Sequence, residues 1–269
     1  MKCGTTSLFY TLAKHPEVAA STIKEPGFFK SDDAFAKGSA WYLDLFGWNH
    51  DRHTIAVEAS GAYSMCMAYQ DVPLRMRSTG WTFRFVYLVR DPLERIRSHY
   101  LHNAAKNMGL PPLAKGLNDF TIDFSRYHKQ LGFYRDAFDR ESILVLSQDD
   151  LKTDPNGAVD QVCDHLGIAR NGDVTLKTLH MSEYHYHRAL LIQELRKRNS
   201  VAEGITLDNI HEILSALSAD EQEAIEARAK AHYTLSEADC ERVRRELADE
   251  MRLLHADYGI DVTRWGFKA

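Results

Sequence analysis

The sequence has no long run of apolar residues. No segment reaches the roughly 20 consecutive apolar residues that a transmembrane helix needs, so no membrane span is expected. The chain starts with a polar turn and a short amphipathic run, which is not the pattern of a secretory signal peptide. We therefore expect a cytoplasmic location.

Paired cysteines and an excess of positive charge are also missing. The four cysteines are far apart and none is in a CxxC pair, which predicts reduced thiols and no metal site: Cys3, Cys66, Cys163 and Cys240. The formal net charge of -5 argues against general affinity for nucleic acid or anionic membranes. An anion site would have to come from a local concentration of positive charge.

Short β-rich segments alternate with helical ones. The 269 residues are enough for one large α/β domain or two small ones. Strands are expected at 18–22, 54–58, 84–90 and 142–147, and helices at 7–14, 92–104 and 158–166. Helices between strands imply parallel pairing with right-handed crossovers, so the fold class is α/β with a central parallel sheet flanked by helices. Ligands bind such sheets beyond the carboxyl ends of the strands, where Glu58 and Arg90 lie.

From about residue 185 the sequence is mostly helical and densely charged. No flexible linker isolates this part, so we expect one domain over residues 1–269, with about 185–235 as a helical insertion or cap. The segment contains six basic or histidine residues that would suit either a loop over an anionic ligand or a solvated helix face: His185, His187, Arg188, Arg196, Lys197 and Arg198.

Two short motifs carry most of the chemistry. The segment Lys2-Cys3-Gly4-Thr5-Thr6-Ser7 precedes a helix, where backbone N–H groups, hydroxyls and a cation can hold a phosphate. Taken alone it could equally be a polar turn that caps the helix, and it lacks the GxxxxGK[ST] order of a Walker A loop. In the second motif, Arg90 ends a strand and Ser98 follows in the next helix. An arginine there can bind phosphate in bidentate fashion, or pair with Asp91 or Glu94.

Together, the two motifs resemble those of sulfotransferases that use 3′-phosphoadenosine-5′-phosphosulfate (PAPS) and release 3′-phosphoadenosine 5′-phosphate (PAP). Lys2 to Leu8 resembles their 5′-phosphosulfate loop, and Arg90 with Ser98 resembles their 3′-phosphate motif. The segments Glu25-Pro26-Gly27-Phe28-Phe29 and Val57-Glu58-Ala59-Ser60 resemble the glycan-type branch, which includes heparan sulfate sulfotransferases and bacterial relatives. Most of the chain outside about 170–233 is covered.

The resemblance implies a P-loop-like three-layer fold, no metal, and transfer of a sulfuryl group to a hydroxyl or amine of a carbohydrate or other small molecule. It implies that the nucleotide contacts come from Lys2, Cys3, Gly4, Thr5, Thr6, Ser7, Arg90, Ser98 and Tyr127. Tyr127 is expected near a later strand of the sheet. Lys2 is the implied partner of the leaving phosphate oxygen.

Glu25 is the candidate general base. The glycan-type branch has a glutamate at this position, and Phe28 and Phe29 would bury its surroundings and raise its pKa. The alternative is an exposed carboxylate paired with Lys24. His99 is a weaker rival, because a helical histidine of this kind more often packs or caps.

Departures from the family pattern leave alternatives open. Family members enter the phosphate loop from a buried strand that the sequence lacks, so the first strand is expected either upstream of Met1 or lost in a truncated protein. A non-catalytic PAP- or PAPS-binding protein is therefore one alternative. A P-loop kinase-like enzyme is another, which would need a Walker A loop and an acidic Mg²⁺ ligand. Acceptor identity and oligomeric state stay open.

Overall fold

A computed structural model describes residues 2–170, 181–198 and 205–269. It divides into two compact units. Unit 1 comprises Met1–Asp91, Asp123–Thr178 and Leu247–Ala269, and unit 2 comprises Pro92–Ile122 and Leu179–Glu246. Each unit is described by itself.

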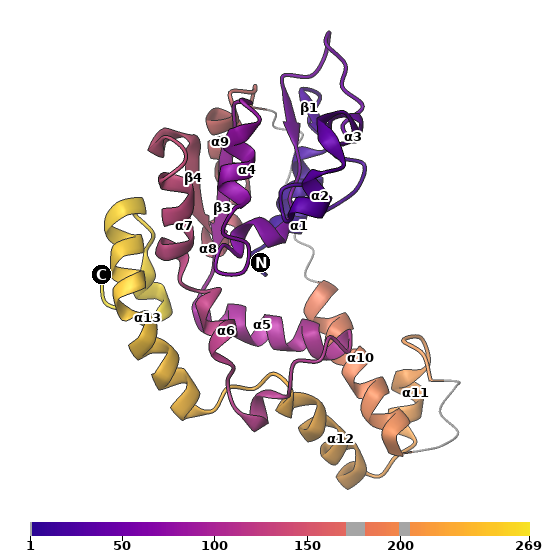
Figure 1. Cartoon of the computed structure of the whole chain (residues 1–269). Helices are drawn as coiled ribbons and strands as arrows, with labels where there is room; N and C mark the ends of the chain where they lie inside the picture. The colour runs from indigo at the N-terminus through magenta and orange to yellow at the C-terminus, as the bar shows by residue number, and fades with distance from the viewer. Residues whose placement is uncertain (1, 171–180, 199–204) are drawn as a thin grey trace. The chain divides into compact units, whose positions relative to one another are not determined.

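The described residues of unit 1 include four strands in two parallel pairs (Figure 1). β1 (Val18–Ala20) pairs with β2 (Ile55–Val57), and β3 (Phe85–Val89) pairs with β4 (Ile143–Ser147). The parallel pairing and the position of every strand confirm the sequence-based prediction. Among the described residues, however, the strands form two two-stranded sheets instead of one continuous sheet.

Helices separate the strands of unit 1, as the alternating pattern predicts. They are α1 (Thr5–Leu12), α2 (Asp32–Phe35), α3 (Gly38–Asp44), α4 (Val72–Ser78), α7 (Tyr127–Arg135), α8 (Gln148–Thr153) and α9 (Pro155–Leu166). α9 begins with Pro155 in its first turn and ends at Gly167, whose φ of 73° is the left-handed conformation that glycine adopts readily. Tyr127 begins α7, and its ring contacts Tyr87 of β3 at 6.5 Å between centroids.

One apolar core joins both sheets of unit 1. Side chains of α1, β1, β3, β4, α8 and α9 meet in it, including Leu8, Val18, Leu88, Leu146 and Val162. A second, aromatic cluster surrounds Phe28 and Phe29, which are fully buried. The C-terminal segment of unit 1 begins with the end of α13 (Glu237–Tyr258), where Asp257 accepts hydrogen bonds from His128 and Arg135 of α7, and it continues through a 3₁₀ helix at Val262–Trp265.

Unit 2 is helical. It contains α5 (Pro92–Ala105), α6 (Asp119–Asp123, at the boundary), α10 (Met181–Arg198), α11 (Ile210–Ser215), α12 (Ala219–Ala231) and the start of α13. This agrees with the helical character predicted from residue 185 onward, apart from residues 199–204, which lie outside the described residues. Whether the two units are one functional domain stays a prediction.

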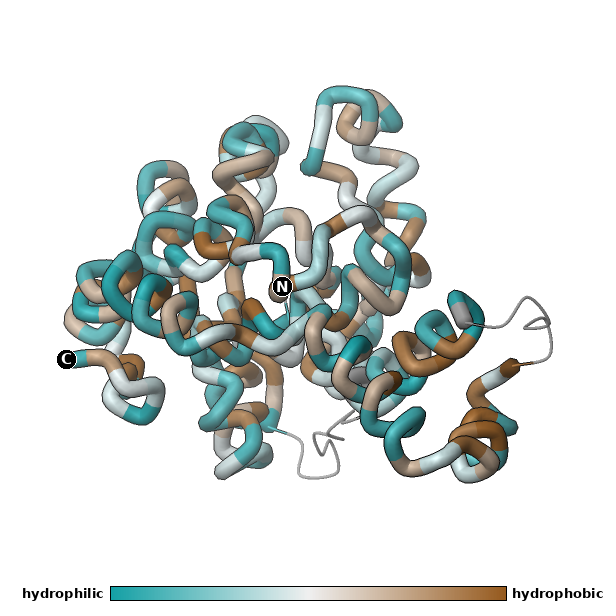
Figure 2. Tube along the Cα trace, turned by 90° about the horizontal axis from the view of Figure 1, so that it is seen from below, coloured by the Kyte–Doolittle hydropathy of each residue, from teal (hydrophilic) through white to brown (hydrophobic). Residues whose placement is uncertain are grey.

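None of the helices in the described part of the chain combines the length and apolar character needed to cross a membrane. In Figure 2, the brown apolar stretches along the helices are short and interrupted by teal polar ones.

Candidate functional site

The phosphate-loop candidate folds as a left-handed turn at the start of α1. Lys2 has φ 65° and Gly4 has φ 99°, and Gly4 is the N-cap of the helix. Within the described residues no side-chain hydrogen bond caps α1, and the backbone N–H groups of a helix's first turn point toward the loop that precedes it. The helix dipole adds partial positive charge at the same point. This geometry suits an anion.

Cys3 has a different role from its neighbours in the loop. Its side chain is 1% exposed and belongs to the core cluster with Leu8 and Leu12. It therefore anchors the turn, and only its backbone is left for a ligand. Thr5, Thr6 and Ser7 are each partly exposed at the helix start.

Arg90 and Tyr127 lie beside this loop. Arg90 follows β3, and its Nη1 donates a hydrogen bond to the carbonyl oxygen of Lys2 at 3.3 Å. The Tyr127 hydroxyl donates to the carbonyl oxygen of Arg90 at 2.7 Å, and Tyr127 is 2% exposed. Residues from three separate segments are thus joined at the carboxyl end of β3.

Gln148 is a neighbour that the sequence patterns did not single out. It follows Ser147, the last residue of β4, and its Nε2 would lie 3.6 Å from a Cβ placed on Gly4. Its buried Oε1 has no hydrogen-bond partner among the described residues. The only available signal was its position directly after a buried strand.

Ser98 lies in α5 and therefore in unit 2, so its approach to a phosphate beside Arg90 stays a prediction. His99, the weaker base candidate, is 7% exposed within the same helix.

The Glu25 carboxylate is not buried by the adjacent phenylalanines. Its side chain is 46% exposed, whereas Phe28 and Phe29 turn into the aromatic core at 0% exposure. Glu25 Oε1 lies 2.5 Å from Lys24 Nζ. The expectation that the two rings desolvate Glu25 is therefore wrong, because both rings pack into the aromatic cluster and leave the carboxylate half-exposed. An exposed ion pair of this kind stabilises the fold little.

The backbone around Glu25 is held by the segment after β2. Glu25 has φ 59°, an uncommon conformation for a residue with a side chain. The N–H of Gly27 donates to Ser60 Oγ at 2.9 Å, and the N–H of Phe29 donates to the Tyr63 hydroxyl at 3.2 Å. A Cβ placed on Gly61 would lie 3.8 Å from Glu25 Oε2. The Glu25 side chain therefore lies beside this turn.

Glu58 is the desolvated carboxyl group of this region. Its Oε2 accepts from the N–H of Ser60 at 2.7 Å, and its Oε1 accepts from the Tyr42 hydroxyl at 3.3 Å. Burial raises the pKa of Glu58, and hydrogen bonds from Tyr63, Ser60 and Tyr42 partly offset the increase. Burial and the nearby Glu58 charge also raise the pKa values of Tyr42 and Tyr63. The environment expected around Glu25 is thus found around Glu58.

Basic residues and histidines of α10 form hydrogen bonds and ion pairs within unit 2. His187 contacts Glu226 through Nε2 at 3.0 Å and the Tyr233 hydroxyl through Nδ1 at 2.9 Å. Lys197 Nζ lies 2.5 Å from Glu194, and Arg196 donates to a carbonyl oxygen at 2.8 Å. The side chain of Arg198 lies outside the described ones. Within the described residues, no group of three or more histidine, cysteine or acidic side chains is arranged to hold a metal ion.

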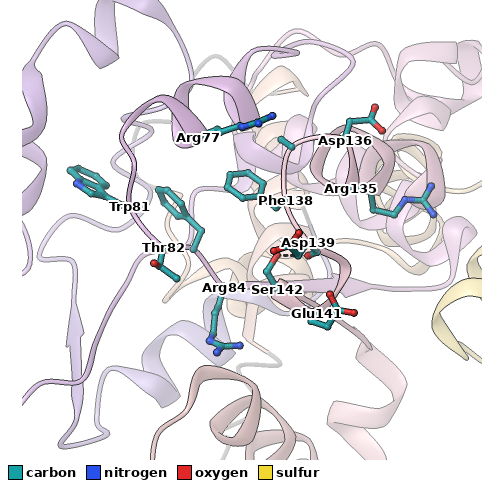
Figure 3. Close-up of a pocket in the computed structure, with 12 residues that line it drawn as sticks. Arg77, Trp81, Thr82, Arg84, Arg135, Asp136, Phe138, Asp139, Glu141 and Ser142 are labelled. Atoms are coloured by element: carbon teal, nitrogen blue, oxygen red, sulfur yellow. Dashed lines mark hydrogen bonds between the residues drawn. The ribbon is translucent and has the colours of Figure 1, made fainter.

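An open cavity of about 560 Å³ lies elsewhere in unit 1 (Figure 3). Residues next to the amino ends of β3 and β4 line it, including Trp81, Phe83, Phe138 and three arginines. The side chains of Arg77, Arg84 and Arg135 do not point toward one another in Figure 3, and acidic residues share the rim. None of the predicted site residues lines this cavity.

Comparisons with known proteins identify the family of the chain. A family model described as a sulfotransferase domain matches residues 1–206. Human heparan sulfate glucosamine 3-O-sulfotransferase 3B1 is 31% identical over 180 residues, which cover 63% of this chain and 44% of that protein. Human heparan sulfate glucosamine 3-O-sulfotransferase 6 is 30% identical over 179 residues, which cover 63% of this chain and 50% of that protein. The chain thus spans about half the length of these curated relatives.

A solved structure has a similar fold. The crystal structure of a sulfotransferase from Alicyclobacillus acidocaldarius superposes with a TM-score of 0.65 at 17% identity, covering 98% of this chain and 95% of that one. At this identity the likeness concerns the fold alone, and it agrees with the predicted α/β class.

Proposed function

Because the chain belongs to the sulfotransferase family, we propose that it transfers a sulfuryl group from PAPS to a hydroxyl or amino group of a carbohydrate or other small acceptor. The observation that carries the proposal is the hydrogen bond between Arg90 and the Lys2 carbonyl, with Tyr127 on the other side of Arg90. It joins two motifs 88 residues apart, which in the family bind opposite ends of one nucleotide.

The residues present fit a nucleotide with two phosphate groups. Gly4 adopts a left-handed conformation at an uncapped helix start, so the first-turn N–H groups can donate to the 5′-phosphate. The guanidinium of Arg90 can donate to the 3′-phosphate, and Ser98 is proposed to add a hydroxyl donor. Gln148 Nε2, which would lie 3.6 Å from a Cβ placed on Gly4, can add a side-chain donor at the same place. PAPS, when bound, supplies the activated sulfuryl group.

Lys2 and Glu25 are the proposed catalytic residues. The Lys2 ammonium would offset the negative charge that grows on the departing phosphate oxygen. A positive charge that is in place before the reaction lowers the barrier in this way. Glu25 would accept the proton of the attacking hydroxyl or amine. Its half-exposed carboxylate is accessible to an acceptor, and breaking the Lys24 ion pair costs little.

The acceptor class follows from the relatives. Two human relatives carry the name heparan sulfate glucosamine 3-O-sulfotransferase, so a glucosamine-containing glycan is the first acceptor to test. The contact surface for the acceptor stays open.

Replacement of Glu25 by glutamine tests the base assignment. Glu25→Gln keeps the size of the side chain but cannot take up a proton, so kcat should fall by about 10²–10⁴-fold while the Kd for PAP stays within about twofold. Asp44→Asn, an exposed carboxylate of α3, is the matched control and should leave both unchanged. Activity of Glu25→Gln within a few-fold of the parent would remove Glu25 from the base role. PAP binding without transfer by the parent protein would instead indicate a binding protein.

A further inference from the structure

The carboxyl group of Glu58 meets three groups at the end of β2. Its Oε2 accepts the N–H of Ser60 at 2.7 Å, and its Oε1 accepts the Tyr42 hydroxyl at 3.3 Å. The Tyr63 hydroxyl lies near Glu58 and offsets part of the rise in the pKa of its carboxyl group. These three residues come from α3 and from the turn after β2, so a single carboxyl group joins two separate segments.

The same three residues hold the segment that follows Glu25. Ser60 Oγ accepts the N–H of Gly27, and the Tyr63 hydroxyl accepts the N–H of Phe29. The ring of Tyr42 stacks on Phe28 at 4.5 Å between centroids and 13° between planes. Each of the three contacts therefore runs from Glu58, through one residue, to residues 27–29.

In this network Glu58 is the acceptor on which the other residues depend for their positions. The Tyr63 hydroxyl oxygen accepts a hydrogen bond from the N–H of Phe29, so the Tyr63 hydroxyl proton can point to Glu58. Both oxygens of the Glu58 carboxyl group accept hydrogen bonds. The bond from the Ser60 N–H fixes the Ser60 backbone, and that backbone sets the position of Ser60 Oγ. Without Glu58, these polar groups would lose a partner inside a desolvated region.

Glu25 needs such support because little else fixes it. Its φ of 59° is sparsely populated for a residue with a side chain, and surrounding structure must maintain it. The contact with Lys24 is between neighbours on the surface and constrains the backbone little.

We propose that Glu58 is a positioning residue that fixes the backbone of Glu25 through Ser60, Tyr63 and Tyr42. The proposal rests on the proposed function, since it gives Glu58 a role in the reaction of Glu25. This role requires no contact between Glu58 and the acceptor or the donor. It acts on the geometry of residues 25–29, and a base misplaced by about 1 Å can lose about a hundredfold in rate.

The experiment measures amide hydrogen exchange at Gly27 and Phe29 together with kinetics, in the parent protein, Glu58→Ala and Glu58→Gln. We expect Glu58→Ala to speed exchange of both amides by about tenfold, which corresponds to one lost hydrogen bond. We expect kcat to fall by about a hundredfold, with the KM for PAPS and the Kd for PAP unchanged. Glu58→Gln keeps one acceptor oxygen, so its effects should be smaller. Asp44→Asn is the control and should match the parent.

The two readouts separate the positioning role from the proposed function. If exchange at Gly27 and Phe29 is unchanged in Glu58→Ala, the positioning proposal is wrong whatever the activity. If exchange rises but kcat stays at the parent value, the role of Glu58 in the reaction is also refuted. If the parent transfers no sulfuryl group while exchange responds as expected, the proposed function fails and the structural link stands. Should Glu58→Ala not fold, Ser60→Ala must speed exchange at Gly27 while leaving Phe29 protected; equal exchange at both amides contradicts the network.

Discussion

Replacement of Arg90 by alanine tests the contact that joins the two nucleotide motifs. Arg90 is half-buried after β3, and its guanidinium reaches the carbonyl of Lys2 at 3.3 Å. A hydrogen bond to a charged group contributes about 1.5–3 kcal/mol, and the 3′-phosphate would receive at least one from Arg90. Loss of that free energy corresponds to a rise of about 10- to 150-fold in the Kd for PAP.

Isothermal titration calorimetry with PAP measures this change. Arg84→Ala is a matched control, because Arg84 precedes the same strand at its amino end and lines the cavity of Figure 3. We expect Arg84→Ala to bind PAP like the parent. A Kd for Arg90→Ala within twofold of the parent, or an equal loss in Arg84→Ala, would refute the 3′-phosphate assignment.

Two further predictions concern stability. Tyr127→Phe leaves the carbonyl of Arg90 without its 2.7 Å donor, so the free energy of unfolding in urea should fall by about 1–3 kcal/mol, and no change would contradict the contact. Glu58 has a pKa above its ordinary value of 4.5 because of burial, so the folded state holds its proton more tightly than the unfolded state does. The stability of the parent should therefore decline relative to Glu58→Gln as pH rises from about 4.5 through the raised pKa, and a pH-independent difference between the two would exclude a desolvated Glu58.

Local patterns predicted the elements of the fold well. β3 and β4 are dense in β-branched and apolar residues, and α9 has both a proline start and a glycine end, so each signal lies within the element itself. The two-sheet arrangement was not predicted. It depends on which strand edges meet, and that is a long-range property that a short window of sequence does not contain.

The site could be predicted only in part, because contacts between distant segments are likewise not contained in a short window of sequence. Motif positions gave Lys2, Gly4 and Arg90 as neighbours of a ligand, but no local pattern reveals that Cys3 faces the core or that Gln148 approaches Gly4. The desolvated environment that was predicted for Glu25 is found at Glu58 instead. Adjacency in sequence placed Phe28 and Phe29 next to Glu25, whereas their rings pack with Tyr42 and leave the Glu25 carboxylate half-exposed.

Transfer of labelled sulfuryl groups from PAPS tests the central claim most directly. The intact protein is incubated with ³⁵S-labelled PAPS and a panel of glucosamine-containing glycans and small hydroxylated or amino acceptors, and labelled product is quantified with and without a chelator. We predict labelled product on at least one acceptor, with PAP released in equal amount. No transfer to any acceptor, together with transfer of phosphate from ATP in the presence of Mg²⁺, would contradict the account.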